Sequence, residues 1–278
     1  MKKLSLPMLW IVALLLCTSC SSFLYFPTQV MHYDPKQLGL VPEDIEIEVA
    51  PKVKIHGWYL KSSVKKPKGV LVFFHGNAQN LTSHYVTLSW ILKEGYDYFI
   101  WDYRGYGKSQ GEPHPQNTVE DGKAVIKYIY NKNPKLPLFV FAQSLGGAIG
   151  MRSVIDLKGE IPIRALIVDS TFESYKSVGS DVLSHHWITW LFQPLAYLVL
   201  SDKYSPKGKV PEVSPIPLLV MHGTKDAVVS YKFGEQIFQD AKDPKEFWTI
   251  ENGTHIDSFW GAHGDEFRKK FLAYLKKY

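Results

Sequence analysis

Cysteine is almost absent from this chain of 278 residues, since its two cysteines, Cys17 and Cys20, both lie near the amino terminus. The rest of the sequence therefore has no disulfide bonds and no thiolate ligands for a metal. The histidine pair at positions 185 and 186 is too isolated to indicate a metal site, and we expect no metal and no other cofactor. A hydrophobic core must hold the fold, and a hydrophobic content of 45% is enough to build one.

A large excess of charge of one sign is also lacking, because the net charge is only +5 at pH 7. Nothing in this balance indicates a nucleic-acid partner. Internal repeats and linkers rich in glycine, serine or charged residues are absent as well. The sequence therefore predicts a single domain over residues 45–278, preceded by a lead-in at 21–44.

The first twenty residues have the pattern of an export signal. Two lysines precede an almost wholly apolar run, Leu4–Leu16, which is short for a membrane span. Thr18-Ser19-Cys20 resembles the bacterial lipobox, so we expect lipidation of Cys20 and a membrane-attached lipoprotein of the bacterial cell envelope. Cys17 stands where that motif usually has leucine. A retained anchor helix and a plain signal peptide of a secreted protein therefore remain alternatives.

Apolar runs typical of buried strands alternate with helical segments along the body of the chain. This alternation predicts an α/β fold, in which helices cover both faces of a mostly parallel sheet. Two earlier segments, 45–49 and 55–60, predict an antiparallel lead-in, and a capping signal at Thr118 predicts a helix over 119–130. The predicted strands are Val70–Phe74, Tyr98–Trp101, Leu138–Phe141, Ala165–Val168, Leu218–Met221 and Phe247–Ile250.

The third predicted strand of the parallel part runs into Ala142-Gln-Ser144-Leu-Gly146, the most informative stretch of the sequence. A strand that turns abruptly into a helix can hold a serine in a strained conformation, provided that small residues stand two positions before and after it. Ala142 replaces the usual first glycine by the smallest possible side chain. The sequence therefore predicts a nucleophile elbow with Ser144 at its tip, although a helix-capping serine is the simpler alternative.

A serine hydroxyl needs a base and an orienting acid, which in this architecture follow it along the chain in the order acid, histidine. Asp226 follows the strand 218–221, and His255 follows the strand 247–250. Each alone could be an ordinary turn or loop residue. Together, in the expected order, they indicate a Ser-His-Asp triad. Asp169, at the end of the strand 165–168, is the rival acid, but the chain order favours Asp226.

An acyl-transfer site also needs backbone N–H groups for the oxyanion. The elbow supplies the amide of Leu145 at a helix amino terminus. The loop His75-Gly76-Asn77 after the first predicted parallel strand can supply the other, for which we choose the amide of Asn77. We interpret His75 itself as a structural residue that fixes the loop.

These motifs resemble the α/β-hydrolase superfamily, and more narrowly its serine-aminopeptidase-like and membrane-associated depalmitoylase-like esterase branch. The resemblance extends over most of the chain from residue 45 and implies hydrolase chemistry on an acyl substrate. We expect cleavage of carboxylic ester or thioester bonds. A serine peptidase or amidase, or an inactive hydrolase fold used as an envelope binding protein, are the alternatives. The matching segments are Phe74–Ala78, Asp102–Ser109, Ala142–Gly147, Met221–Asp226 and Gly253–His255.

An apolar insertion over 174–213 interrupts the alternation of strands and helices. In this fold a segment at that place would overhang the serine, so we expect a small helical lid that lines a hydrophobic acyl pocket. A pair of ordinary core-packed helices is the alternative.

Overall fold

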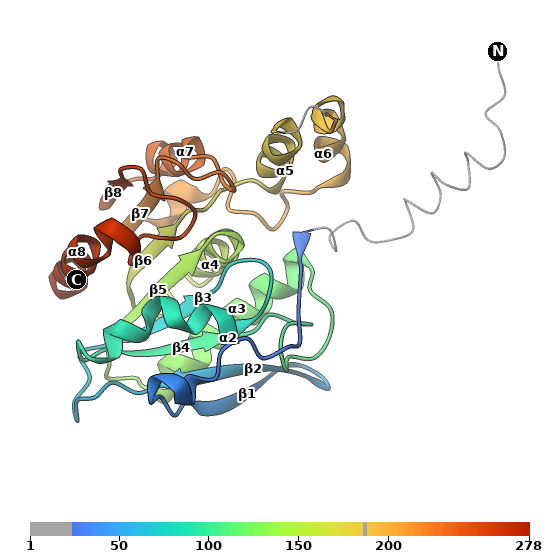
Figure 1. Cartoon of the computed structure of the whole chain (residues 1–278). Helices are drawn as coiled ribbons and strands as arrows, with labels where there is room; N and C mark the ends of the chain where they lie inside the picture. The colour runs from blue at the N-terminus through green and yellow to red at the C-terminus, as the bar shows by residue number, and fades with distance from the viewer. Residues whose placement is uncertain (1–23, 186–187) are drawn as a thin grey trace, which may run out of the picture.

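An eight-stranded sheet runs through the residues that the computed structural model describes, 24–185 and 188–278 (Figure 1). The strand order is β1-β2-β4-β3-β5-β6-β7-β8. β1 pairs antiparallel with β2, and β2 with β4, whereas all later neighbours are parallel. The predicted fold class, a mostly parallel α/β sheet, is therefore confirmed. The strands are β1 (Glu43–Ala50), β2 (Val53–Leu60), β3 (Val70–Phe74), β4 (Asp97–Trp101), β5 (Leu138–Gln143), β6 (Ile163–Asp169), β7 (Leu218–Gly223) and β8 (Lys245–Ile250).

Helices connect the parallel strands and cover both faces of the sheet. The α-helices are α2 (Leu81–His84), α3 (Pro115–Lys132), α4 (Leu145–Asp156), α5 (Tyr175–Ser184), α6 (Gln193–Val199), α7 (Lys232–Asp240) and α8 (Gly264–Lys277). Short 3₁₀ turns are η2 (Pro35–Leu38), η3 (Tyr85–Leu92), η4 (Trp190–Phe192), η5 (Val210–Val213) and η6 (Gly261–His263).

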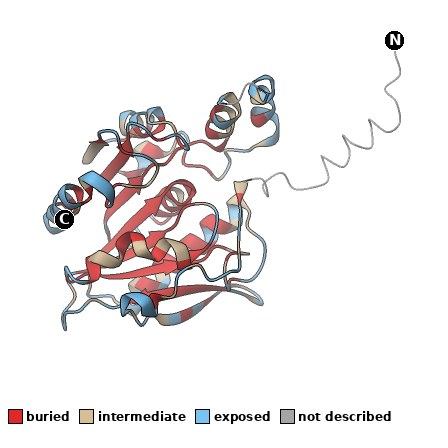
Figure 2. Ribbon diagram, viewed as in Figure 1, coloured by how far each residue is buried: buried red, intermediate tan, exposed pale blue. Residues whose placement is uncertain are grey.

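The core consists of two layers, because successive side chains of a strand point to opposite faces. In β3, Val70, Val72 and Phe74 pack with α3 and α4, whereas Leu71 and Phe73 pack with η3 and α8. Both faces are buried, which explains why the central strands are continuously apolar rather than alternating. Figure 2 shows the sheet and α4 as the buried centre of the molecule.

The start of α3 differs from the prediction. Thr118 lies inside the helix and its hydroxyl donates to the carbonyl of His114. The helix instead begins at Pro115, and the side chain of Asn117 accepts the N–H of His114 at 2.8 Å. Proline at the first helical position has its φ already set and lacks an N–H that would have no partner there. The threonine-based capping signal therefore predicts a helix start that is one turn too late.

The predicted signal segment, including Cys17 and Cys20, lies outside the described residues. Within the described ranges no helix has the length and apolar character needed to cross a membrane.

The insertion joins β6 to β7 and forms α5, η4, α6 and η5. Figure 1 shows α5 and α6 standing out from the layered body. They pack on each other at Gly179, where an added Cβ would lie 2.5 Å from the side chain of Leu200. Within η4 and α6 only Ala196 is buried, so these two elements are not the core-packed helices of the alternative interpretation.

Candidate active site

Ser144 stands at the turn between β5 and α4 with φ 53° and ψ −125°. This backbone region is costly for a residue with a side chain, by about 1–3 kcal/mol. The surrounding hydrogen bonds hold it there: the Ser144 N–H donates to the carbonyl of Asp169 at 3.0 Å, and the Thr171 hydroxyl donates to the Ser144 carbonyl at 2.6 Å. The turn therefore has the strained conformation of a nucleophile elbow, as the sequence pattern predicts.

Close packing explains why glycines stand two and three positions after Ser144. A Cβ on Gly146 would lie 2.3 Å from the carbonyl oxygen of His75, and one on Gly147 would lie 2.2 Å from the hydroxyl of Thr171. The alanine that replaces the usual first glycine is accommodated by Gly150 on α4, where an added Cβ would come within 3.0 Å of the Ala142 methyl. The departure from the usual motif thus leaves the elbow intact.

Ser144, His255 and Asp226 come together from the ends of three strands. His255 Nε2 lies 3.1 Å from Ser144 Oγ, and His255 Nδ1 lies 2.8 Å from Asp226 Oδ2. The His255 side chain is 18% exposed to solvent, and Ser144 is 7% exposed. The pair is therefore almost enclosed but remains within reach of a substrate.

Asp226 is held in place and kept ionised by several donors. Its Oδ1 accepts the N–H groups of Val228 and Val229, each at 2.9 Å, and His222 Nε2 lies 3.4 Å from its Oδ2. Burial alone would raise the pKa of Asp226, but the interactions with His222 and His255 and the Val229 amide lower the pKa well below its ordinary value. A carboxylate that stays charged can orient an imidazole and stabilise its protonated form.

Asp169, the rival acid, has other partners. Its carboxylate accepts the side-chain amide of Gln143 and the hydroxyl of Ser258, both at 2.8 Å. Burial raises the pKa of Asp169, and the hydrogen bonds from Gln143 and Ser258 and the nearby His222 and His255 offset this rise only in part. The carboxylate therefore links the elbow to the loop that carries His255 instead of contacting the imidazole.

Two amides beside Ser144 are free to bind an oxyanion. Leu145 is the first residue of α4, and neither its N–H nor that of Asn77 has an acceptor among the described residues. The side chain of Asn77 has several partners: its Oδ1 accepts from Phe26 N, Tyr106 Oη and Ala78 N, and its Nδ2 donates to Leu24 O at 2.8 Å. The side chain fixes the loop, and the backbone N–H is left for a ligand.

Residues 24–32, which we call the N-terminal strap, lie across this loop. Thr28 N donates to Gln79 O at 3.1 Å, and Asn80 Nδ2 donates to the carbonyls of Thr28 and Val30. The loop needs such support because Ala78 and Gln79 both have left-handed φ, 62° and 59°. The left-handed conformation raises the free energy of the folded state by about 1–2 kcal/mol for each residue that is not glycine. The strap therefore stabilises a strained loop directly after Asn77.

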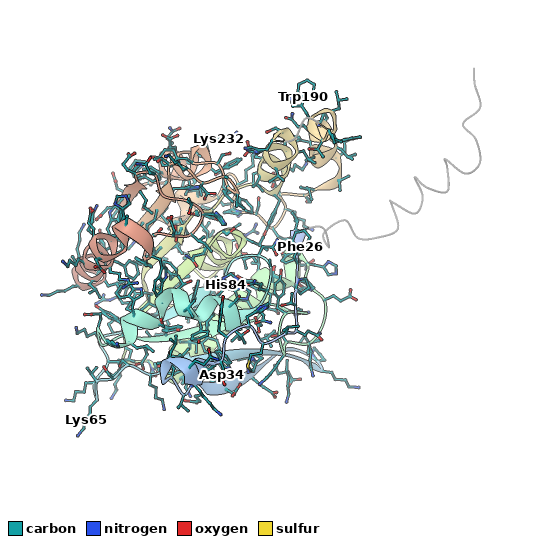
Figure 3. The ribbon with its side chains drawn as sticks, viewed as in Figure 1. Phe26, Asp34, Lys65, His84, Trp190 and Lys232 are labelled. Atoms are coloured by element: carbon teal, nitrogen blue, oxygen red, sulfur yellow. The ribbon has the colours of Figure 1, made fainter. Side chains whose placement is uncertain are left out.

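His84 and His75 complete the surroundings of the serine. An added Cβ on Gly76 would lie 3.5 Å from both His84 Cε1 and Ser144 Cβ, so His84, labelled in Figure 3, flanks the candidate nucleophile. Burial and the neighbouring His75 lower the pKa of His84 to about 3, so its ring is neutral at physiological pH. His75 is fully buried, donates from Nδ1 to Gly76 O at 2.7 Å, and stacks on His84. His75 thus has the structural place expected of it.

Sequence reasoning missed three contributions to this site: His84, His222 and the strap. A histidine at the end of a four-residue helix and one inside a buried strand carry no motif of their own. The sequence of residues 24–32 likewise has no periodicity that indicates a long-range contact.

Comparison with known proteins shows the family and the fold of this chain. Residues 65–210 match the family model described as serine aminopeptidase, S33. The uncharacterized protein YfhR of Escherichia coli K12 is 32% identical over 262 residues, covering 91% of this chain and 86% of YfhR. Protein bem46 of Schizosaccharomyces pombe is 27% identical, covering 86% of this chain and 79% of bem46. The fold is also that of the Pyrococcus furiosus esterase Pf2001, with a TM-score of 0.73 at 20% identity, covering 92% of this chain and 98% of the esterase.

Proposed function

Because this chain belongs to the S33 serine aminopeptidase family of α/β hydrolases, we propose that it cleaves carboxylic ester or thioester bonds with Ser144 as the nucleophile. One observation carries this proposal. The hydrogen bonds from Ser144 Oγ to His255 and from His255 to Asp226 form one continuous chain, which starts at the strained turn between β5 and α4. Such a chain is what a serine needs to become nucleophilic near neutral pH.

In the first half of the reaction, Ser144 Oγ attacks the acyl carbon while its proton passes to His255 Nε2. The carbonyl π electrons move to oxygen, and the N–H groups of Leu145 and Asn77 hold that oxyanion. The amino terminus of α4 adds a favourable electrostatic potential at the same place. When the intermediate collapses, the bond to the leaving oxygen or sulfur breaks, and that atom takes the proton from Nε2.

In the second half, His255 removes a proton from water, and the resulting oxygen nucleophile attacks the acyl-Ser144 ester. Collapse returns the proton from Nε2 to Ser144 Oγ and releases the carboxylic acid. The ionised Asp226 keeps Nδ1 protonated and stabilises the imidazolium in both halves.

Amide bonds are the second candidate substrate, and the description of the matching family model as serine aminopeptidases favours them. An inactive binding protein is the third candidate. A complete and connected hydrogen-bond chain argues against it, since a protein that only binds has no use for an activated serine.

We further propose that the enzyme is a membrane-attached lipoprotein of the bacterial cell envelope, with lipidation at Cys20. The support is the sequence pattern alone: two lysines, the apolar run Leu4–Leu16 and the small residues before Cys20. Replacing Cys20 by serine should release a lipoprotein from the membrane fraction. A chain held by an anchor helix would stay there.

The activity is tested with the full chain in detergent, assayed against p-nitrophenyl esters of increasing acyl length and against an aminoacyl p-nitroanilide. Ser144→Ala should abolish hydrolysis of the esters, and a fluorophosphonate should label the wild type stoichiometrically on Ser144. Ser153→Ala is the matched control and should retain activity, since Ser153 is a buried serine on α4, the helix that follows Ser144. Hydrolysis that survives Ser144→Ala would refute the assignment of the nucleophile. Labelling without ester turnover, but with cleavage of the anilide, would instead support the amide candidate.

A further inference from the structure

The insertion presents apolar side chains to the outside of the molecule. From residue 182 to residue 201 the sequence has no aspartate, glutamate, lysine or arginine. Leu191 is 74% exposed and Leu198 is 82% exposed. We define the apolar face by its exposed large side chains, which are Trp190, Leu191, Phe192, Leu195, Tyr197 and Leu198. A cluster of this kind on the surface usually marks a contact with a membrane or another protein.

The apolar face belongs to an ordered part of the fold. Asp181 on α5 accepts hydrogen bonds from Ser230 Oγ and Lys232 Nζ, which lie on the loop after Asp226 and at the start of α7. Ser174 Oγ donates to Asp202 at 2.8 Å and connects the start of α5 to the segment that follows α6. α6 packs on α5 through Ala196. The other apolar side chains of η4 and α6 are therefore directed to the outside of the molecule. Figure 3 shows Trp190 at the outermost part of the insertion.

The position of the amino terminus indicates what lies against this face. Leu24, the first described residue, lines a hollow of about 730 Å³ together with Val199 and Leu200 at the end of α6. Leu24 lies four positions after Cys20, and four extended residues span at most about 14 Å. If the proposed lipid is attached at Cys20, the insertion must therefore lie close to the membrane surface. Lys203, which lines the same hollow, places a positive charge where anionic headgroups would be.

We propose that the apolar face docks into the interfacial region of the lipid bilayer and forms a second membrane contact beside the N-terminal attachment. Its composition fits that partner, because tryptophan and tyrosine favour the boundary between headgroups and acyl chains, with leucine and phenylalanine on the apolar side. The contact does not depend on the hydrolase activity.

Docking also orients the active site. The insertion starts at Ser174, close to the carboxyl end of β6, where the carbonyl of Asp169 binds the N–H of Ser144. The membrane therefore lies on the edge of the sheet that carries the candidate nucleophile. Resting on the proposed function, this placement indicates substrates whose acyl chains are delivered from the bilayer.

Fluorescence quenching by lipids with brominated acyl chains tests the contact directly. The full chain, with Trp10→Phe to remove the tryptophan of the N-terminal segment, is reconstituted in vesicles of phosphatidylethanolamine and phosphatidylglycerol. We expect its emission to fall in brominated vesicles, and Trp190→Phe to remove much of that fall. Trp260→Phe is the matched control, since Trp260 is also exposed, at 43% against 57% for Trp190, but lies next to η6. The proposal would be overturned if Trp190→Phe and Trp260→Phe reduced the quenching equally, or if brominated lipids did not quench the emission at all.

A second pair of variants tests the apolar face itself. Leu191→Asp combined with Leu198→Asp should abolish the quenching of Trp190. Leu38→Asp combined with Val41→Asp, which changes two exposed apolar residues at and after the end of η2, should leave it unchanged. A chain that forms dimers in the absence of lipid, and that the first pair of substitutions turns into monomers, would show an interface between copies and refute membrane docking. Because no outcome here involves catalysis, failure of the docking proposal and failure of the proposed function remain distinguishable.

Discussion

Removal of the first part of the N-terminal strap should impair catalysis although it leaves the triad untouched. A chain that begins at Pro27 lacks Leu24 and Phe26, which provide the acceptor for Asn77 Nδ2 and a donor to Asn77 Oδ1. Asn77 then keeps only its bonds to Tyr106 and to its neighbour Ala78. The loop after it contains two left-handed residues and has less to hold it in that conformation.

The expected size of the effect follows from the number of lost contacts. Two hydrogen bonds of about 0.5–1.5 kcal/mol each hold the Asn77 side chain and thereby its backbone N–H in position, so their loss should lower kcat by about fivefold to 150-fold. The upper limit is the complete loss of one oxyanion donor, about 10²–10³ in kcat. Stability should fall as well, by about 3–5 kcal/mol, because the buried Tyr25 is removed.

The assay compares kcat for a soluble short-chain p-nitrophenyl ester in chains that begin at Leu24 and at Pro27, at a temperature where circular dichroism shows both folded. Tyr25→Phe in the longer chain is the control. It removes the bond from Tyr25 Oη to Thr118 and lowers stability, but it does not touch Asn77, so its kcat should stay unchanged. Equal kcat in the two truncated chains would show that the strap does not position the oxyanion amide.

Three further predictions concern the acid, a buried carboxyl group and the elbow. Asp226→Asn should lower kcat by about 10⁴-fold, because it leaves the imidazole of His255 in the wrong tautomer. Asp169→Asn should instead lower the free energy of unfolding by about 1–3 kcal/mol and change kcat by less than about tenfold. Steady-state kinetics measure the first effect, and urea unfolding measures the second. Burial and the nearby carboxylate of Asp240 raise the pKa of Glu173 from 4.5 to about 7, so the free energy of unfolding should fall by about 3 kcal/mol as pH rises through that interval. Glu173→Gln should flatten this dependence, and an unchanged pH profile would contradict it. Gly150→Ala should destabilise the protein by about 1–3 kcal/mol through overpacking, and adding Ala142→Gly should recover part of the loss in a double-mutant cycle of thermal unfolding.

The sheet could be predicted from the sequence because its central strands are short apolar runs at the spacing of βα units. Leu138–Gln143 and Leu218–Gly223 are buried on both faces, so nearly every position had to be apolar and the signal was strong. The order serine, acid, histidine then followed from the topology, since the carboxyl ends of parallel strands meet along one edge. The predicted start of α3 was wrong because threonine is common both at helix caps and in the first helical turn. Pro115, three residues before Thr118, was the better signal for the first residue of the helix.

The contacts of the insertion and the strap could not be predicted for a different physical reason. An apolar helix has the same composition whether it faces a core, a pocket or a membrane, and only the packing at Gly179 decided which side of α6 is covered. The strap pairs with a loop about fifty residues away through single hydrogen bonds, in which the Leu24 carbonyl accepts and the N–H groups of Phe26 and Thr28 donate. Such pairings leave no periodic trace in either segment, because each depends on a backbone group that every residue carries.

The strap and the insertion together relate attachment of the amino terminus to catalysis. Leu24 lines the same hollow as the end of α6, and its carbonyl accepts a hydrogen bond from Asn77, so a change in the position of residue 24 alters both the hollow and that hydrogen bond. A membrane that fixes the amino terminus and the apolar face would hold Leu24 from two sides and thereby restrict the loop that carries the oxyanion amide. The same fold free in solution keeps the triad geometry, which depends on β5, β7 and β8, but has lost that restraint on Asn77. We therefore expect membrane attachment to increase kcat even for a soluble ester that gains nothing from proximity to the bilayer, and the increase to disappear in Asn77→Ala.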